Sequence, residues 1–194
     1  YFDDGSEYGV NMRYYVEESP LGTAGSVKNA EEFLDETFLV ISGDAITDID
    51  LTKAVDFHFK KKSVATLVLK KVDIPLEYGV VVTNEDGEIT RFLEKPSWGE
   101  VFSDTVNTGI YILSPEIFKY YKKNEMFDFS KDLFPMLLKE KVPMYGYITE
   151  DYWCDIGDHI SYIQSHIDIM EGKVKVNIPG KQVREKVWVD EGKQ

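Results

Sequence analysis

The chain has 194 residues, of which 43% are hydrophobic and 29% are charged, and its formal net charge is -13. This composition is typical of one globular domain with a single principal core, and it is not that of a disordered chain. The acidic charge argues against nucleic acids and anionic membranes as partners, because binding to either depends on a field of Lys and Arg.

The cysteine and histidine content excludes several kinds of site. Cys154 is the only cysteine, so an intrachain disulfide and a cysteine-based zinc site are excluded, as suits a protein of the reducing cytoplasm. His58, His159 and His166 have no metal-ligand spacing and are expected to be surface or hydrogen-bonded helix residues. The longest apolar runs have the length of strands, well short of the ~20 residues of a membrane helix. Residues 1–6 contain no initiator Met, so we expect the chain to begin within a longer protein.

Strand-like and helical patterns alternate in the first part of the chain. Residues 12–17 are predicted to form a strand, and residues 23–34 a helix with Thr23 as its N-cap. Residues 37–42 form a continuously apolar run, which is the pattern of a strand covered by helices on both faces.

One more helix and one more strand complete this alternation. Asp50 can cap a helix whose apolar stripe contains Leu51, Val55 and Phe59, and residues 63–69 follow as a buried strand. The succession of strands and helices predicts an α/β fold with parallel strands.

Shorter strands predominate in the second half. Four are predicted, at 79–83, 89–94, 105–113 and 144–148. The sequence Asn-Glu-Asp-Gly at 84–87 signals a hairpin between the first two, so the sheet should be mixed. Short helices are expected after Ser114 and after Ser130.

The chain ends in a helix followed by a change of pattern. Asp158 is the predicted N-cap of this helix, whose apolar residues recur three and four positions apart and should face the core: Ile160, Ile163, Ile167 and Met170. From residue 174 the helical period is lost and strand fragments follow, as in a linker where a second module could begin.

Two carboxylates are expected at strand ends. In open α/β sheets the ligand crevice lies outside the carboxyl ends of the parallel strands. Asp44 follows the strand at 37–42 directly after Gly43, and Asp155 lies at a second predicted junction between a strand and a helix. These two side chains could share a Mg²⁺ ion that also holds phosphate oxygens, or Asp44 could simply cap a turn.

Three further polar motifs could contact a ligand. Residues 21–25 (Leu-Gly-Thr-Ala-Gly) lead into a helix, where backbone amides can approach a ligand or the last glycine can allow close helix packing. Glu94 and Lys95 end a strand with opposite charges that point in different directions, and they could bind hydroxyls and phosphate or form surface ion pairs. Asn107 and Thr108 suit sugar hydroxyls or internal hydrogen bonds.

Taken in order along the chain, these segments resemble the sugar-1-phosphate nucleotidyltransferases, especially the mannose-1-phosphate guanylyltransferase branch. The resemblance covers nearly the whole chain. It is carried by EESPLGTAG at 17–25, SGD at 42–44, EYGVV at 77–81, FLEKP at 92–96, NTGIY at 107–111 and WCDIG at 153–157.

The resemblance implies a role for each segment. The implied nucleotide-binding residues are Glu18, Leu21, Gly22, Thr23, Gly25 and Gly43. The implied hexose-binding residues are Gly79, Glu94, Asn107 and Thr108. The implied catalytic residues are Asp44, Lys95 and Asp155, of which the two aspartates would bind Mg²⁺ and the lysine would hold the phosphate of the sugar.

The resemblance also implies the architecture. The expected fold is α/β, a Rossmann-like nucleotidyltransferase (GT-A-like) three-layer sandwich with a mixed, mostly parallel sheet and with the first βα unit missing. The family's first strand and its Gly-rich, Arg- and Lys-bearing loop, which clamps the triphosphate, are absent from this sequence, so the stretch by itself is expected to be inactive. Residues 1–173 would be the catalytic domain, and residues 174–194 a linker and the start of a left-handed β-helix module.

The implied reaction is nucleotidyl transfer from a nucleoside triphosphate, GTP by this resemblance, to mannose 1-phosphate, giving a nucleotide sugar and pyrophosphate. No nucleic acid or membrane partner is expected, and homo-oligomerisation is left open. Two alternatives remain. Asp48-Ile49-Asp50 has the Asp-x-Asp pattern of metal-dependent glycosyltransferases, and a chain that keeps the sugar pocket without the triphosphate clamp could be a non-catalytic regulatory module that binds a nucleotide sugar.

Overall fold

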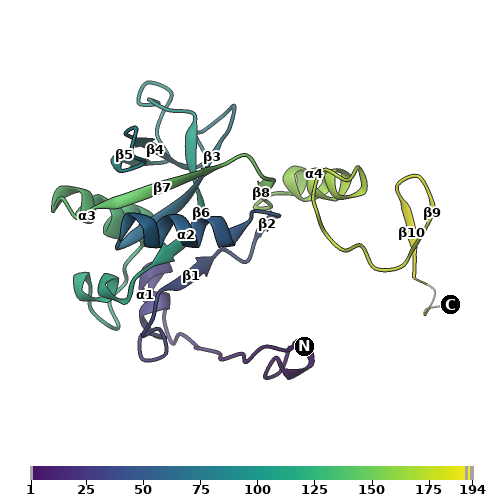
Figure 1. Ribbon diagram of the computed structural model, residues 1–194, viewed down its shortest axis with the longest axis horizontal. Coiled ribbons are helices and arrows are strands. Elements are labelled where there is room, and N and C mark those ends of the chain that lie inside the picture. Colours follow the sequence, from purple (N-terminus) through teal and green to yellow (C-terminus); the bar gives the residue numbers. More distant parts are fainter. Residues whose placement is uncertain (1, 191, 193–194) are drawn as a thin grey trace.

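A mixed sheet forms the centre of the computed structural model, which describes residues 2–190 and 192. Within these residues the sheet has six strands in the order β5-β4-β6-β3-β7, and β1 pairs with β6 as well (Figure 1). The strands are β1 (Phe38–Ile41), β3 (Ala65–Lys71), β4 (Gly79–Thr83), β5 (Ile89–Glu94), β6 (Thr105–Leu113) and β7 (Met144–Thr149).

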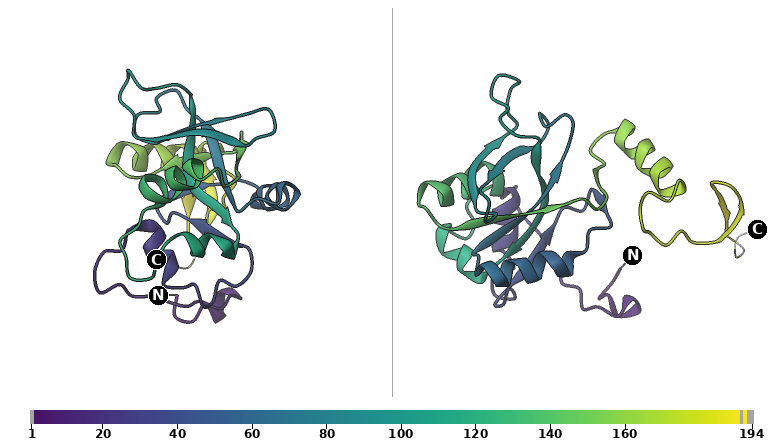
Figure 2. Two further views of the ribbon diagram at one scale, coloured as in Figure 1. Left: turned by 90° about the vertical axis from the view of Figure 1, so that its left-hand side faces the viewer. Right: turned by 45° about the horizontal axis from the view of Figure 1, so that its top comes forward.

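Helices cover both faces of this sheet, which gives the expected three layers. One face is covered by α2 (Leu51–Lys61). The other face is covered by α1 (Gly22–Lys28), a 3₁₀ turn (Pro115–Tyr120), a π-helical turn (Phe129–Leu133) and α3 (Phe134–Lys139). A further 3₁₀ turn (Ser6–Tyr8) lies near the N-terminus, and Figure 2 shows the layers from two other sides.

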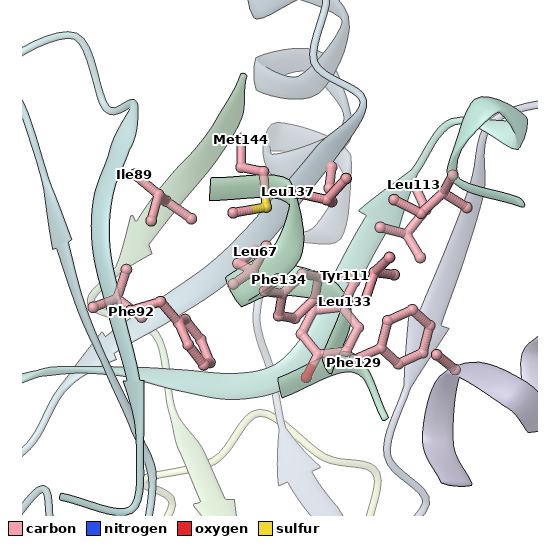
Figure 3. Packing of buried hydrophobic residues seen from close by; sticks show 14 of the residues in the cluster. Leu67, Ile89, Phe92, Tyr111, Leu113, Phe129, Leu133, Phe134, Leu137 and Met144 are labelled. Atoms are coloured by element: carbon pink, nitrogen blue, oxygen red, sulfur yellow. The ribbon is translucent and has the colours of Figure 1, made fainter. Parts of the chain in front are cut away.

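Successive side chains of the two central strands, β3 and β6, point alternately into the two cores on opposite faces of the sheet. In β3, Leu67 and Leu69 join the larger core with α3, whereas Val68 between them joins the smaller core with α2. In β6, Tyr111 faces the larger core and Ile112 the smaller one. A strand with both faces covered has a continuous apolar sequence, and β3 is accordingly buried from residue 65 to residue 69. Figure 3 shows the aromatic and aliphatic packing of the larger core.

The expectation of a mostly parallel sheet is wrong. Only β3 and β7 form a parallel pair within the described residues, while β1–β6, β3–β6, β4–β6 and β4–β5 are all antiparallel. The reason is the position of β6, which enters the centre of the sheet against the direction of β1 and β3. The βαβαβ pattern thus correctly predicts that β1 and β3 run parallel. The two strands are not paired with each other, however, because β6 lies between them.

The N-terminal elements also differ from the prediction. Residues 12–17 are extended but form no strand, because no partner strand lies beside them in the described chain. The helix expected at 23–34 ends at Lys28 and continues as tight turns, with i to i+3 hydrogen bonds such as Ala30 N to Val27 O. Thr23 is not the N-cap, because the helix begins one residue earlier and the hydroxyl of Thr23 donates to Asp128.

Two predicted features of the next elements are corrected as well. β1 is covered on one face only: Phe38 and Val40 pack on the larger core, while Leu39 and Ile41 are exposed because α2 lies over β3, β6 and β7 instead. Asp50 precedes α2 as predicted but makes no side-chain cap, because its carboxylate pairs with Lys53 at 3.2 Å.

Several other predictions are confirmed. The strands β4, β5 and β6 begin and end where the sequence places them, and the hairpin at 84–87 closes with Gly87 N donating to Asn84 O at 2.9 Å. A short antiparallel ribbon was not predicted from the sequence. In it β2 (Ala45–Thr47) pairs with β8 (Trp153–Asp155), although the two strands lie more than a hundred positions apart in the chain.

The last helix stands beside the sheet instead of packing on it (Figure 1). Asp158 caps α4 (His159–Met170) with a capping box, as predicted, but Ile160 is 81% exposed and Ile163 is 59% exposed. The predicted core-facing stripe is therefore wrong, because α4 contacts the body mainly through β8 and no sheet lies opposite its apolar side. The described chain ends in a hairpin of β9 (Lys181–Arg184) and β10 (Val187–Val189). None of the helices in residues 2–190 combines the length and apolar composition needed to cross a bilayer.

His58 is a buried member of α2 with both ring nitrogens hydrogen-bonded. Its Nδ1 lies 2.9 Å from Thr66 Oγ1, and its Nε2 lies 3.2 Å from Ser114 Oγ. Because the Ser114 hydroxyl donates its hydrogen to Ser63 O, it must accept from Nε2, which leaves Nδ1 as the acceptor. Burial lowers the pKa of His58 below its usual 6.5.

We predict that His58 contributes to loss of stability in acid. The folded state binds the proton less readily than the unfolded state, so the contribution is complete above pH 6.5 and is lost as pH falls through 6.5 toward the folded pKa. Titration of this one group can change the free energy of unfolding by no more than about 1.4 kcal/mol per pH unit. Urea unfolding between pH 7.5 and 5 should show that the free energy of unfolding falls less steeply with falling pH in His58→Gln than in the unchanged protein. The exposed His166→Gln is the control, and an equal change in both variants would contradict the prediction.

Candidate active site

Pairing of β2 with β8 brings the two predicted metal ligands together. Ala45 lies opposite Asp155 in this ladder, and Ile156 N donates to Asp44 O at 2.9 Å. Asp44 precedes β2 and Asp155 ends β8, so both carboxylates belong to the same end of the ribbon. A Cβ added at Gly157 would lie 3.5 Å from Asp155 Oδ1, which is an ordinary contact distance.

The charges of this pair fit a cation. Burial and the neighbouring charge of Asp44 raise the pKa of Asp155, which means that the two carboxylates repel each other. Within residues 2–190 and 192, no group of three or more His, Cys, Asp or Glu side chains gathers to hold a metal. Two carboxylates suit Mg²⁺, because Mg²⁺ usually takes only one or two protein carboxylates and completes its shell with water and phosphate oxygens.

A cavity of about 210 Å³ opens beside the aspartates and collects most of the predicted site residues. Its wall contains all three predicted catalytic residues and all four predicted hexose-binding residues: Asp44, Lys95, Asp155, Gly79, Glu94, Asn107 and Thr108. They come from the ribbon, from β4 and β5, and from β6. Four carboxylates, one lysine amine and several hydrogen-bonding groups therefore surround this space; the carboxylates are those of Asp44, Glu77, Glu94 and Asp155.

The end of β5 shapes one wall of this cavity. Lys95 has a left-handed backbone with φ of 44°, rare for a residue with a side chain, and its N–H donates to Tyr78 O at 3.1 Å. Gly79 lies opposite Glu94 in the sheet, and a Cβ at this glycine would come within 2.7 Å of Glu94 Oε2. Burial, together with the nearby charge of Asp128, raises the pKa of Glu94. The half-buried carboxylate thus lies against the space that Gly79 leaves free.

The polar side chains of β6 are held by internal hydrogen bonds. Asn107 donates to Tyr111 OH at 2.9 Å and to Ser130 Oγ at 3.2 Å, while its Oδ1 accepts from Gly109 N. The hydroxyl of Thr108 donates to Val68 O at 2.8 Å. Both side chains are therefore fixed by the protein itself. Their oxygens keep free lone pairs, which can accept hydrogen bonds from the hydroxyls of a hexose.

The predicted nucleotide-binding loop lies at a different cavity. Glu18 and Leu21 line a larger space of about 680 Å³, together with Tyr14, Tyr15 and Lys123. Of the other nucleotide-binding residues predicted, Gly22 and Gly25 allow close packing of α1, because a Cβ at either would come within 2.7 Å of a carbonyl oxygen of residues 125–127.

Backbone amides at the start of α1 are also occupied by protein. Ala24 N and Gly25 N both donate to Phe127 O, at 3.0 and 2.9 Å. Thr23 bonds through its hydroxyl to Asp128 at 2.8 Å. Gly43 is exposed next to Asp44 with open space around it, and it does not line the cavity beside the aspartates.

The Asp-x-Asp pattern at 48–50 serves a structural purpose. Asp48 accepts hydrogen bonds from Tyr152 N at 2.8 Å and from Lys175 N at 2.9 Å, so both of its carboxylate oxygens are bound by backbone. Asp50 pairs with Lys53. Both carboxylates are therefore engaged by other protein groups, which disfavours the glycosyltransferase alternative.

Eight residues at the cavity were not predicted as site residues: Ser42, Ala45, Glu77, Tyr78, Gly109, Tyr111, Ser130 and Trp153. Tyr78 and Trp153 form an edge-to-face pair with ring centroids 5.3 Å apart, and Tyr111 and Ser130 lie beside Asn107. Tyr78, Trp153 and Tyr111 belong to the segments that carry the family resemblance, which could have drawn attention to them. Ser130 lies outside those segments, so no signal in the sequence points to it.

Comparison with known proteins defines the class to which this site belongs. The family model described as nucleotidyl transferase matches residues 1–172. The chain belongs to the sugar-1-phosphate nucleotidyltransferase family, and the family members are transferases.

Its relatives carry more than one substrate name. The chain is 39% identical to a UTP–glucose-1-phosphate uridylyltransferase of Synechocystis, over 97% of this chain and 52% of the relative. It is 40% identical to a mannose-1-phosphate guanyltransferase of Candida albicans, over 78% of this chain and 42% of the relative. The chain thus spans about half the length of these curated relatives.

A solved structure supports the fold. A putative glucose-1-phosphate thymidylyltransferase of Bacillus anthracis, solved in complex with a sucrose, is similar with a TM-score of 0.76 and 26% identity. The match covers 93% of this chain and 72% of that chain. The Rossmann-like nucleotidyltransferase fold expected from the sequence is therefore confirmed, with the change in strand direction described above.

Gly109 is predicted to be required for the shape of the cavity. It has φ of 76° at the irregularity of β6, and a Cβ there would lie 2.7 Å from Ser42 Oγ. Gly109→Ala should lower the free energy of unfolding by about 1–3 kcal/mol, the usual cost of such a strained residue. Urea unfolding measures this loss. Gly99→Ala, where a Cβ meets nothing within 4 Å, should change stability by less than about 0.5 kcal/mol. Equal losses in the two variants would show that strain at Gly109 is unimportant.

Proposed function

We propose that the full-length protein transfers a nucleotidyl group from GTP to mannose 1-phosphate, giving GDP-mannose and pyrophosphate. The observation that carries this proposal is the convergence of Asp44, Asp155 and Lys95 on one cavity that also contains Glu94 and Asn107. Carboxylates for a divalent cation, an amine for a phosphate and acceptors for sugar hydroxyls are the groups that this reaction needs in one place.

The reaction requires positioning and charge neutralisation more than covalent chemistry. An oxygen of the sugar 1-phosphate attacks the α-phosphorus of the triphosphate, and the bond from that phosphorus to the bridging oxygen breaks as pyrophosphate leaves with the electron pair. Lys95 steadies the attacking phosphate. When bound by Asp44 and Asp155, Mg²⁺ would supply charge neutralisation for the phosphates. Glu94 orients the hexose by accepting hydrogen bonds from its hydroxyls.

The choice of GTP and mannose rests on the Gly-Thr-Ala-Gly loop at 22–25 and on relatives named as mannose-1-phosphate guanylyltransferases. UTP and glucose 1-phosphate are the second candidate pair, because the relative that matches 97% of this chain carries that name. We propose that the protein acts in the cytoplasm, which its single unpaired cysteine permits.

A third function is binding without turnover. The polar groups that line the cavity beside the aspartates suit a bound sugar whether or not transfer follows. Calorimetry with GDP-mannose, together with an assay of pyrophosphate release, separates binding without turnover from nucleotidyl transfer. Binding by a full-length protein that releases no pyrophosphate would favour a regulatory module over an enzyme.

The first test removes one carboxylate. Asp44→Asn in the full-length protein should lower kcat by about 10²–10³-fold, because charge on the reacting phosphates is no longer neutralised. The side chain of Asp44 is exposed, so the melting temperature should stay unchanged. Pyrophosphate release is the measurement.

Asp50→Asn is the matched control for this test. It neutralises an exposed aspartate six positions away that belongs to the Asp-x-Asp pattern, and it should leave kcat unchanged. Near-normal turnover by Asp44→Asn would remove Asp44 from the proposed role. Loss of activity in Asp50→Asn alone would return attention to the glycosyltransferase alternative.

The second test concerns the substrates. We expect kcat/KM for GTP with mannose 1-phosphate to exceed that for UTP with glucose 1-phosphate by at least about tenfold, equivalent to about 1.4 kcal/mol of discrimination. Pyrophosphate release with the four combinations of these nucleotides and sugars is the assay. A preference for UTP and glucose would replace the proposed substrates, and release with none of them would contradict the proposed reaction.

A further inference from the structure

Asp128 joins the predicted nucleotide loop to the wall of the predicted sugar cavity. One of its carboxylate oxygens, Oδ2, accepts the hydroxyl hydrogen of Thr23 at 2.8 Å. The other, Oδ1, accepts from Ser130 N at 2.9 Å and from Lys131 N at 3.0 Å. A single side chain therefore binds α1 with one oxygen and the π-helical turn with the other.

On the side of α1 the connection is reinforced by backbone. Thr23 Oγ1 also accepts from Phe129 N at 3.0 Å, and the amides of Ala24 and Gly25 donate to Phe127 O. In return, Phe127 N donates to Leu21 O at 2.8 Å. Because Gly22 and Gly25 leave no room for a Cβ against residues 125–127, a shift of the loop at 21–25 must be followed by a shift of the segment at 125–129.

On the side of the cavity the connection ends at sugar-facing groups. Ser130 lines the cavity, and its hydroxyl accepts from Asn107 Nδ2 at 3.2 Å. The charge of Asp128 also acts on Glu94 through space. The position of Ser130, which Asp128 sets through the backbone amide, therefore acts on Asn107 by this hydrogen bond, and Asn107 is one of the groups that face a hexose.

We propose that Asp128 is a positioning residue that couples the two substrates, so that a nucleotide on the loop at 21–25 tightens binding of the sugar 1-phosphate. This inference rests on the proposed function. The nucleotide fixes the loop, the loop fixes Asp128 through Thr23, and Asp128 fixes Ser130 at the cavity. By linkage, the sugar 1-phosphate tightens nucleotide binding by the same factor.

The test compares the affinity for mannose 1-phosphate with and without a nucleotide in the full-length protein. Calorimetry gives the Kd alone and in the presence of guanosine 5′-(α,β-methylene)triphosphate, whose α–β bridge cannot be cleaved. We call the ratio of the two Kd values the coupling ratio and expect about 5 or more in the unchanged protein, the lower end of typical couplings.

Two variants cut the connection at different places. Thr23→Val removes the hydroxyl without changing the shape of the side chain, and Asp128→Ser keeps one oxygen to cap Ser130 N and Lys131 N while removing the oxygen that Thr23 uses. Each should bring the coupling ratio close to 1, with the Kd for mannose 1-phosphate alone changed less than about twofold. Thr23→Ser restores the hydroxyl and should restore the ratio. Thr90→Val, which removes an exposed hydroxyl of β5 outside both cavities, is the control and should keep the ratio of the unchanged protein.

The outcomes separate this inference from the proposed function. If Thr23→Val weakens nucleotide binding but keeps the coupling ratio, Thr23 is only a direct contact and the inference is wrong. A ratio of 1 in the unchanged protein, with both ligands bound, overturns the inference and leaves the proposed function standing. If the unchanged protein binds neither ligand, the proposed function fails and the inference fails with it.

Discussion

The site depends on one short backbone pairing, the ladder between β2 and β8. This ribbon sets Asp155 opposite Ala45 and therefore beside Asp44, although burial and the repulsion between the two carboxylates raise the pKa of Asp155. Neighbouring bonds brace it: Thr47 Oγ1 donates to Tyr152 O at 2.8 Å, and Asp48 accepts from Tyr152 N. Two carboxylates held side by side need such bracing, because the pair is unfavourable until a cation neutralises it.

The strand β6 provides the second constraint. Its neighbours are β3 along one edge and β1 and β4 along the other, so it supplies side chains to both cores. The left-handed Gly109 interrupts its regular pairing in the segment that carries Asn107 and Tyr111. Burial and hydrogen bonding fix these side chains, with the pKa of Tyr111 raised to about 12, so the hydroxyl stays neutral at the cavity. A preorganised wall of this kind loses little freedom when a sugar binds.

The coverage of the sheet is uneven, and this has consequences for the elements at its margins. α2 protects β3, β6 and β7, whereas β1 leaves Leu39 and Ile41 exposed. α4 is held to the body by polar contacts, in which the buried carboxylate of Asp168 accepts from Tyr152 OH at 2.9 Å, while its apolar residues Ile160 and Ile163 remain exposed.

The sequence by itself determined the family motifs and their order, the buried strand β3, the hairpin at 84–87 and the capping of α4 by Asp158. These features depend on residues a few positions apart, whose periodicity and turn chemistry are set locally. Only the tertiary structure decided the direction of β6, the exposure of α4, the pairing of β2 with β8 and the presence of Ser130 at the cavity. Each of these depends on contacts between segments distant along the chain, and local patterns do not specify which segments meet or which face of a helix finds a partner.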